Sequence, residues 1–368
     1  MKLRYKITNG VLAVLGLFIV SLAVAISYTS DCPVPDDMAA GTDTMKAVVS
    51  QCYGGPDVLQ YRDVAKPKPG PKDVIVKVHS AAVNPLDYHY MRGSPYLMRL
   101  LAGIGSPNDQ RVGVDFSGVV AETGEEVTRF NVGDEVFGGR SGAFAEYVII
   151  PEDSSVALKP ENVSFDQAAA VPIAAVTALQ ALRDHGHVAA GEKILINGAS
   201  GGVGTYAVQI AVALGAEVDG VCSTRNVDMV QQLGATRVFD YKKEDYTESG
   251  IQYDLIVDMV GNRSVRDNLR VLKAEGRYVR VGGPKGDWIA PLMPTIKEMF
   301  VKPFIDQQIG GMLAQLNGED LEYLAGLMAE GRITSRIDTH YPLSETAEAL
   351  RYLETQRARG KVIIAVNQ

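Results

Sequence analysis

Strand-like and helical patterns alternate along the second half of the chain, and this alternation restricts the fold more than any other feature. The apolar, β-rich runs are 193–198, 217–223, 237–241, 253–261 and 276–283, and the helical patterns between them are 203–214, 226–233 and 264–273. Strands that alternate with helices of this length form βαβ units around a parallel sheet. The sequence therefore predicts a doubly wound α/β domain.

A glycine-rich turn joins the first of these strands to the first helix. Gly198, Gly201 and Gly204 recur at every third position of ILINGASGGVGTYAVQIA. Such a turn lets the backbone approach a pyrophosphate closely, and the following helix offers free N–H groups and the positive end of its dipole. The strand–turn–helix context favours a dinucleotide site over an ordinary tight turn. The residues expected to contact the dinucleotide are Gly198, Gly201, Gly202, Val203 and Gly204.

The end of the next strand indicates which dinucleotide binds. In NAD sites a carboxylate at this place, about 20 residues after the turn, holds the ribose 2′-hydroxyl. Here the sequence is CSTRN (222–226), without a carboxylate. The hydroxyls of Ser223 and Thr224 and the guanidinium of Arg225 suit a 2′-phosphate, because arginine pairs with phosphate through two N–H groups. NADP(H) is therefore the expected cofactor, with a solvated surface charge as the alternative for Arg225.

The first half of the chain has a different pattern. Its β-rich runs, each bounded by Gly, Pro or Asp, are 74–83, 116–124, 133–139 and 144–150. Short strands between turn residues indicate a mostly antiparallel β domain. With 368 residues the chain is long enough for two domains.

An uncharged apolar run precedes both domains. Residues 11–28 read VLAVLGLFIVSLAVAISY and are apolar all round, which argues against a buried core helix. Eighteen helical residues span about 27 Å, close to the ~30 Å of a bilayer core. We predict a single-pass N-terminal membrane anchor whose orientation stays open. A basic flank and the small residues at 23–25 leave secretion after signal cleavage as an alternative, and a start at Met45 would leave a cytoplasmic protein.

Charge and cysteine content exclude other classes of protein. The net charge is −8 and no basic stripe is present, so nucleic acid is not an expected partner. Cys32, Cys52 and Cys222 are few and far apart. This spacing excludes a disulfide framework and a structural zinc site.

Further short motifs share a pattern with one family. They are MKAVV (45–49), AAVNPLDYHYMRG (81–93), GVDFSGVV (113–120), GDEVFG (133–138), NGASGGVG (197–204) and GKVIIAV (360–366). From Met45 to the end the chain resembles the medium-chain dehydrogenase/reductase superfamily, and within it the zinc-free quinone oxidoreductase-like branch. The resemblance implies an α/β fold, with a GroES-like, mostly β catalytic domain and a Rossmann domain, here preceded by an apolar N-terminal helix.

The expected domain boundaries follow from these motifs and from the change of pattern near residue 166. In chain order the parts are an anchor or signal segment (1–28), a linker (29–44), the GroES-like domain (45–165), the Rossmann NADP-binding domain (166–300) and a return segment that completes the catalytic domain (301–368).

The resemblance also indicates the reaction. Zinc-dependent members have a cysteine ligand where this chain has Asn84, and Gly-His-Glu where it has Gly113-Val114-Asp115. A catalytic zinc needs three protein ligands, so we expect no metal. Reduction of an activated C=C bond needs only a hydride from NADPH and a hydrogen-bond donor for the developing oxyanion. The resemblance therefore implies a zinc-independent NADPH-dependent reductase of a lipophilic quinone or α,β-unsaturated carbonyl.

The resemblance suggests individual site residues. Asn84 would orient cofactor or substrate, and Tyr88 or Tyr90 would donate to the oxyanion, unless both tyrosines only line the cleft. Positions that match cofactor contacts in relatives are Thr177 near the nicotinamide, Tyr241 near the adenosine phosphate, Val260 and Gly261 at a strand end, and Lys361 before the last strand.

Two other functions stay open. One is reduction of enoyl thioesters, and the other is an assembly or sensing role for a membrane-tethered NADP-binding protein. The family commonly forms dimers by extending its sheet through stretches such as GRYVRVGG, so a homodimer is expected.

Overall fold

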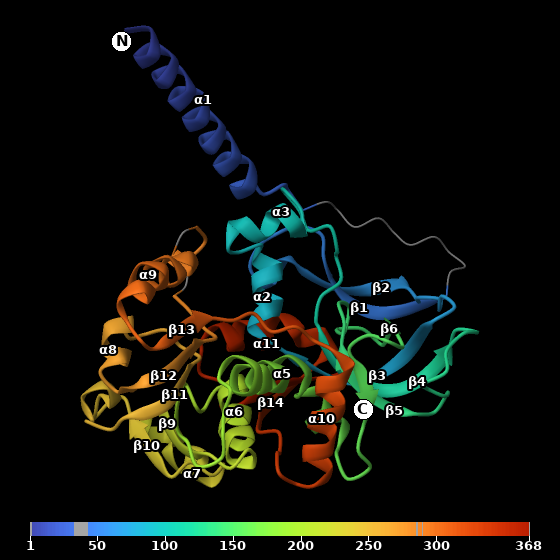
Figure 1. The fold of residues 1–368 in the computed structure, drawn as a ribbon. Helices are drawn as coiled ribbons and strands as arrows, with labels where there is room; N and C mark the ends of the chain where they lie inside the picture. The colour runs from blue at the N-terminus through green and yellow to red at the C-terminus, as the bar shows by residue number, and fades with distance from the viewer. Residues whose placement is uncertain (1, 33–42, 285, 289, 368) are drawn as a thin grey trace.

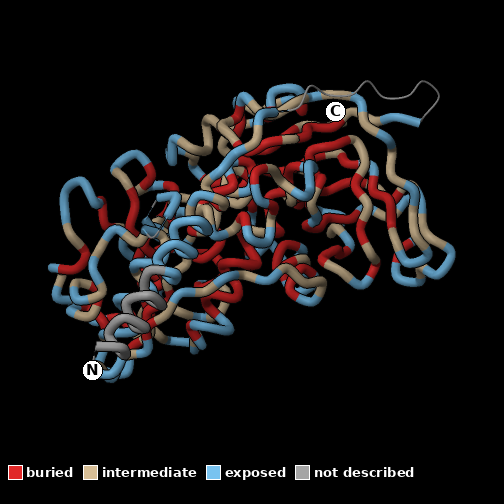
Figure 2. The backbone as a smooth tube through the Cα atoms, turned by 90° about the horizontal axis from the view of Figure 1, so that it is seen from above, coloured by how far each residue is buried: buried red, intermediate tan, exposed pale blue. Residues whose placement is uncertain are grey.

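The computed structural model describes residues 2–32, 43–284, 286–288 and 290–367, and of residues 2–13 only the backbone. A mostly β body and an αβ body lie side by side, and the N-terminal helix projects away from both (Figure 1). Buried residues are concentrated inside the two bodies, whereas most of the N-terminal helix with described side chains is exposed (Figure 2).

The αβ body is built on a six-stranded parallel sheet in the order β10-β9-β8-β11-β12-β13. Its strands are β8 (Lys193–Asn197), β9 (Glu217–Cys222), β10 (Arg237–Asp240), β11 (Tyr253–Asp258), β12 (Leu272–Arg280) and β13 (Gln308–Gly311). The connecting helices are α6 (Gly202–Ala213), α7 (Val227–Gln232) and α8 (Val265–Leu269). This order confirms the doubly wound α/β prediction. It reverses between β8 and β11, where such sheets bind ligands.

The β body contains a seven-stranded sheet in the order β14-β15-β3-β4-β5-β7, with β6 paired to β3. Its strands are β3 (Asp73–Val83), β4 (Asp115–Thr123), β5 (Glu135–Gly139), β6 (Tyr147–Pro151), β7 (Val156–Leu158), β14 (Ile337–Pro342) and β15 (Lys361–Ala365). β1 (Thr44–Ser50) and β2 (Leu59–Ala65) form a separate antiparallel pair. Because β15 pairs with β3, the end of the chain lies against the start of the β body.

The remaining α-helices are α1 (Lys2–Ser27), α2 (Pro85–Arg92), α3 (Arg99–Ala102), α4 (Phe165–Ala169), α5 (Pro172–Gln180), α9 (Met293–Val301), α10 (Gly318–Ala329) and α11 (Thr346–Glu354). α5 and α6 pack in the core of the αβ body, where small and branched residues of both helices are buried. α2 packs against α11 and connects β3 to the segment that carries α3.

The predicted membrane anchor is wrong. Among the described residues, no helix is both long enough and apolar enough to cross a bilayer. The N-terminal helix α1 has its described side chains at residues 14–27. Its last turn belongs to the β body instead, since Ile26 is 3% exposed and Arg99 binds the carbonyl oxygens of Ile26 and Tyr28.

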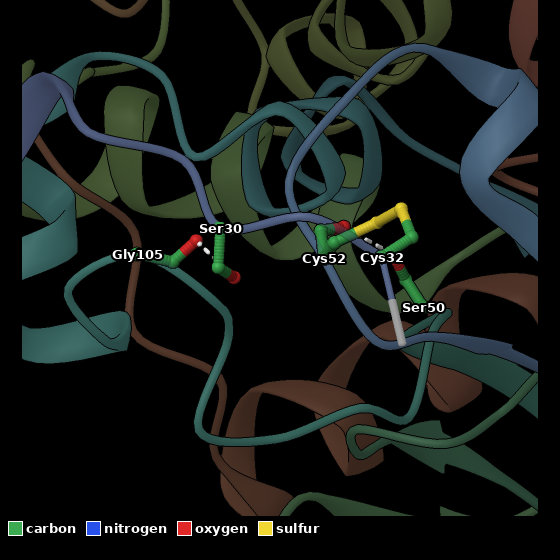
Figure 3. Close-up of a disulfide and its surroundings, with 5 residues drawn as sticks. All are labelled: Ser30, Cys32, Ser50, Cys52 and Gly105. Carbon is green, nitrogen blue, oxygen red and sulfur yellow. Dashed lines mark hydrogen bonds between the residues drawn. A yellow bond between two sulfur atoms is a disulfide. The ribbon is translucent and has the colours of Figure 1, made fainter. Parts of the chain in front are cut away.

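A single disulfide joins Cys32 to Cys52, whose Cα atoms are 5.1 Å apart, although no pair was predicted from the sequence (Figure 3). Next to it, the N–H of Ser30 donates to the carbonyl of Gly105 at 2.9 Å. Sequence spacing did not indicate the pair because the two cysteines meet only after the N-terminal segment docks. Residues 29–32 are therefore fixed to the β body, and residues 33–42 of the predicted linker lie outside the described residues.

The glycines of the turn between β8 and α6 differ in how strictly their positions exclude a larger side chain. Gly198 has φ +89°, a conformation that favours glycine, and a Cβ there would lie 2.8 Å from Val260. A Cβ on Gly204 would lie 2.1 Å from the carbonyl oxygen of Gly198. At Gly201 the nearest atom would be 3.6 Å away. The close approach of helix to strand therefore depends on Gly198 and Gly204.

Replacement of Gly204 by alanine should destabilise the protein, because the new methyl group collides with backbone rather than with a movable side chain. We expect Gly204→Ala to lower the free energy of unfolding by about 2 kcal/mol or more. Gly201→Ala is the matched control and should cost less than about 1 kcal/mol. Urea unfolding of both variants measures the difference, and equal losses would contradict the assignment.

Candidate functional site

Three buried polar side chains meet where three strands of the β body lie side by side. Asn84 follows the end of β3, Asp115 opens β4 and Lys361 opens β15. Both neighbouring strands run antiparallel to β3, so their first residues face its last ones, as in the pairs Ala82↔Asp115 and Val362↔Val83. The side chains of Asn84, Asp115 and Lys361 are no more than 3% exposed. We call these three residues the polar cluster.

The polar cluster is held by direct hydrogen bonds. The ammonium of Lys361 donates to Oδ1 of Asn84 and lies 3.2 Å from Oδ2 of Asp115. Asn84 donates from Nδ2 to Asp115 at 2.9 Å and to the carbonyl of Ala82 at 3.3 Å. Oδ1 of Asp115 accepts the N–H of Ile173 at 3.0 Å, in the first turn of α5. Every polar group of Asn84 is therefore engaged, and its orientation is fixed.

Burial determines the electrostatics of the polar cluster. It raises the pKa of Asp115, and Lys361, Asn84 and the amide of Ile173 offset part of this effect. A buried carboxylate is tolerated only when it is paired and hydrogen-bonded, and Lys361 supplies the opposite charge. The cluster is thus a compensated ion pair, to which Asn84 adds hydrogen bonds.

Asp87 lies one helical turn beyond Asn84. Its Oδ2 accepts the N–H of Asn84 at 2.7 Å and so caps the start of α2. The side chain is 2% exposed, and Oδ1 has no hydrogen-bond partner among the described residues. Burial raises the pKa of Asp87 to about 8, and the negative charge of Asp115 adds to the effect. At neutral pH this carboxyl is therefore protonated.

Lys361 also connects the polar cluster to the glycine turn. A Cβ on Gly202 would lie 3.2 Å from Cδ of Lys361, and the N–H of Gly360 donates to the carbonyl of Ser200 at 3.1 Å. Gly201 and Gly360 pair as an isolated parallel bridge. The start of β15 and the start of α6 therefore share one wall, although one belongs to the β body and the other to the αβ body.

The glycine turn can accept a pyrophosphate. Gly201 caps α6 without a side-chain hydrogen bond, so the first N–H groups of this twelve-residue helix are not covered by a capping side chain. Free helix N–H groups and the helix dipole attract phosphate. The ends of β8 and β11 lie beside this turn, where Val260 and Gly261 each donate a backbone N–H to Asp258 at 2.9 Å. These residues fit a dinucleotide placed across the end of the sheet.

A second polar group lies at the end of β9. Asn226 donates to Oγ of Ser200 at 3.0 Å and to Oγ of Ser223 at 3.3 Å, and it accepts from Arg359 at 3.0 Å. Asn226 thereby joins the glycine turn to the segment predicted for the adenosine phosphate. Sequence reasoning missed Asn226 and Arg359, although Arg359 lies two residues before the predicted Lys361.

The remaining residues predicted for the adenosine end are close to this group. Thr224 donates to Oδ2 of Asp240 at 2.6 Å, and this hydrogen bond lowers the pKa of Asp240. The guanidinium of Arg225 donates to the carbonyl of Arg357, and Tyr241 is 52% exposed. Asp240 was not predicted, because it ends the neighbouring strand rather than β9 itself.

Three predicted residues do not belong to the polar cluster. The hydroxyl of Thr177 donates to the carbonyl of Ile173 at 2.6 Å, within its own helix. The ring of Tyr88 packs against the core of the β body and lies 4.7 Å from the ring of His89. Tyr90 is 51% exposed. The roles of Thr177, Tyr88 and Tyr90 remain predictions.

Comparison with known proteins gives consistent relatives. Residues 70–161 match the alcohol dehydrogenase GroES-like domain, and residues 233–364 match a family described as zinc-binding dehydrogenase. The quinone oxidoreductase of Sus scrofa is 34% identical over 344 residues, with 89% of this chain and 99% of the relative covered. A chloroplastic NADPH-dependent alkenal/one oxidoreductase of Arabidopsis thaliana is 30% identical, with 94% and 83% covered. The structure of a quinone oxidoreductase from Coxiella burnetii superimposes with a TM-score of 0.78 at 33% identity, covering 88% of this chain and all of that one.

The protonated state of Asp87 makes stability depend on pH. The unfolded carboxyl ionises near pH 4, whereas the folded one does so near pH 8, so wild-type stability falls as pH rises between these values. Asp87→Asn removes this titration, and its stability relative to wild type should rise by about 2 kcal/mol or more from pH 5 to pH 8. Urea unfolding at several pH values measures the trend.

The control for this prediction is Asp267→Asn. Asp267 also lies at the third position of a helix, but its hydrogen bond to Ser264 lowers its pKa. Its contribution to stability is present above pH 4 and is lost in acid. The two variants should therefore show opposite trends, and parallel curves would contradict the protonated state of Asp87.

Proposed function

The chain belongs to the medium-chain dehydrogenase/reductase superfamily, and from this we propose that it reduces quinones or other α,β-unsaturated carbonyl compounds with NADPH. It is an oxidoreductase, and its superfamily binds nicotinamide cofactors. The observation that carries the proposal is the place of the Lys361 ammonium, which is bonded to Asn84 and Asp115 beside the glycine turn. Relatives named quinone oxidoreductase and alkenal/one oxidoreductase support the same class of acceptor.

The donor set of the polar cluster favours chemistry without zinc. Where zinc-dependent members carry a cysteine and a histidine ligand, this chain has Asn84 and Val114. The amide oxygen of Asn84 already accepts a hydrogen bond from the Lys361 ammonium, so it is not free to bind zinc. The isopropyl group of Val114 carries no atom that can bind zinc. The Lys361 ammonium, which donates to Asn84, also repels a divalent cation. We therefore propose that the oxyanion is stabilised by hydrogen-bond donors rather than by a metal.

Each part of the proposed site has a physical task. The N–H groups at the start of α6 hold the pyrophosphate, and Lys361 with Asn84 fixes the wall beside the nicotinamide. When bound there, the nicotinamide supplies a hydride to the electron-poor carbon of the acceptor. Both N–H groups of Asn84 are already engaged, so Asn84 positions its neighbours rather than donating to substrate. Tyr88 and Tyr90 remain the proposed donors to the carbonyl oxygen of the acceptor, where negative charge develops.

A panel assay tests the proposal. NADPH oxidation is followed with benzoquinones, naphthoquinones, enones, an enoyl thioester and a simple ketone. We expect turnover of quinones and enones and none of the simple ketone, because only a conjugated acceptor places its charge on an oxygen remote from the attacked carbon. Tight NADPH binding without turnover of any acceptor would overturn the enzyme proposal and favour a sensing or assembly role. Selective turnover of the enoyl thioester would instead favour the thioester reductase.

The choice of NADPH over NADH rests on Arg225. We propose that its guanidinium pairs with the 2′-phosphate, which NADH lacks. Arg225→Ala should weaken NADPH binding about tenfold to a hundredfold and leave NADH binding unchanged, as expected for the loss of a charge-assisted hydrogen bond. Arg237→Ala is the control. Arg237 lies at the start of β10, away from the carboxyl ends of the strands, and it pairs with Glu244. Equal effects on NADPH and NADH would contradict the assignment.

A further inference from the structure

We propose that the docked N-terminal segment determines how bulky an acceptor the enzyme takes. The segment is residues 26–32, which we call the strap, and it acts through Arg99 on residues 93–98, which we call the mouth loop. The inference rests on the proposed reductase function. Both matched family domains begin after residue 69, so the strap is outside them.

Arg99 is the link between the strap and the mouth loop. Its side chain is 3% exposed although it carries a full charge. One guanidinium nitrogen donates to the carbonyls of Ile26 and Tyr28, at 3.2 and 2.8 Å, and to Oγ1 of Thr29 at 3.1 Å. These carbonyls end α1, where the helix dipole favours a cation. Nε donates to the carbonyl of Gly93 at 2.8 Å, so one guanidinium holds both segments.

Two aromatic rings complete the environment of Arg99. The guanidinium carbon lies 4.4 Å from the ring centre of Tyr53 and 4.6 Å from that of Tyr96. Such cation–π contacts are strongest when the cation is desolvated, as it is here. Arg99 therefore packs against the ring of Tyr96, which is part of the mouth loop.

The other side of the mouth loop contacts the αβ body. The ring of Tyr96 meets the ring of Trp288 edge to face, with centroids 4.9 Å apart. The N–H of Tyr96 donates to the carbonyl of Asp287 at 2.7 Å, and Oγ of Ser94 donates to the carboxylate of Asp287 at 2.6 Å. These three contacts join the mouth loop to residues 287–288 of the αβ body.

Chain connectivity links this contact to the candidate site. The mouth loop directly follows α2, which starts at Asn84 of the polar cluster. Asp287 and Trp288 follow Gly283, whose Cα would lie 3.1 Å from a Cβ on Gly261 at the end of β11. The contact between Tyr96 and Trp288 therefore joins the segment that follows α2 in the β body to the segment that follows Gly283 in the αβ body. Under this proposal, an acceptor that reaches the nicotinamide end passes beside this pair of rings.

The strap is itself fastened at three points. Thr29 pairs with Gly105 as a parallel bridge, Ser30 donates to the carbonyl of Gly105, and the disulfide joins Cys32 to Cys52 (Figure 3). Cys52 adjoins Tyr53, which stacks on Arg99 and donates its hydroxyl to the carbonyl of Gly103 at 2.8 Å. The disulfide and the arginine thus hold the same small region, and weakening either one should loosen the mouth loop.

The experiment compares acceptors of different width in the full-length protein. The variants are Arg99→Lys, which keeps the charge but not the planar fork of donors, and the double variant Cys32→Ser/Cys52→Ser. The ratio of kcat/KM for three-ring phenanthrenequinone to that for one-ring benzoquinone should rise about tenfold in both. The change should come from KM of the quinone, and KM of NADPH should stay within twofold. Arg92→Lys is the matched control, since Arg92 pairs with Glu354 of α11, and its ratio should equal that of wild type.

Trp288 supplies a second readout that needs no turnover. It is the single tryptophan of the chain, so its fluorescence reports on the contact with Tyr96. Both test variants should increase quenching of Trp288 by acrylamide and strengthen binding of phenanthrenequinone relative to benzoquinone. If quenching becomes faster but the quinone preference stays unchanged, the inference is overturned and the strap has a merely structural role. Unchanged quenching in both test variants overturns the inference as well. If wild type turns over no acceptor, the proposed function fails, and the quinone binding ratios alone decide about the strap.

Discussion

The ion pair between Lys361 and Asp115 is the interaction on which the rest of the site depends. Neither charge is accessible to water, so each is tolerable only because the other is present. Asp115 also holds the first turn of α5, and Lys361 lies against the glycine turn. One buried pair therefore fixes the ends of three strands, the start of α5 and the glycine turn relative to one another. Removal of either charge would expose all three to rearrangement.

This arrangement explains how two bodies of different architecture form one site. The glycine turn belongs to the parallel sheet and lies at the carboxyl ends of its strands, where such sheets bind ligands. The neighbouring wall belongs to a mostly antiparallel sheet, in which the last strand of the chain, β15, pairs with β3. Because Lys361 opens that strand, the wall is assembled only when the C-terminal segment has returned. The site is consequently a product of the complete fold rather than of either body alone.

Local pattern was sufficient for the αβ body, but not for contacts between distant segments. Strands β8 to β12 and their helices follow from apolar periodicity and glycine stops, whereas β13 is short and glycine-rich and gave no signal. The family resemblance pointed to Asn84 and Lys361, which are 277 residues apart in the sequence. No sequence rule shows that these two residues share hydrogen bonds with each other and with Asp115. Arg99 was missed for the same reason, since its partners in the N-terminal segment lie 70 or more residues earlier. The apolar run at residues 11–28 suggested a membrane span because hydropathy describes only composition. It does not show that the C-terminal end of this helix packs against the β body.

The disulfide changes what a cut in the chain would mean. Cys32 and Cys52 close a covalent ring that contains every peptide bond between them, including those before the first strand. A protease that cleaves one bond inside this ring opens the ring but releases nothing. The N-terminal helix would then travel with the enzyme as a second, disulfide-linked chain, and denaturation alone would not separate the two. Only reduction would do so, which makes the retention of this segment a matter of thiol chemistry rather than of proteolysis.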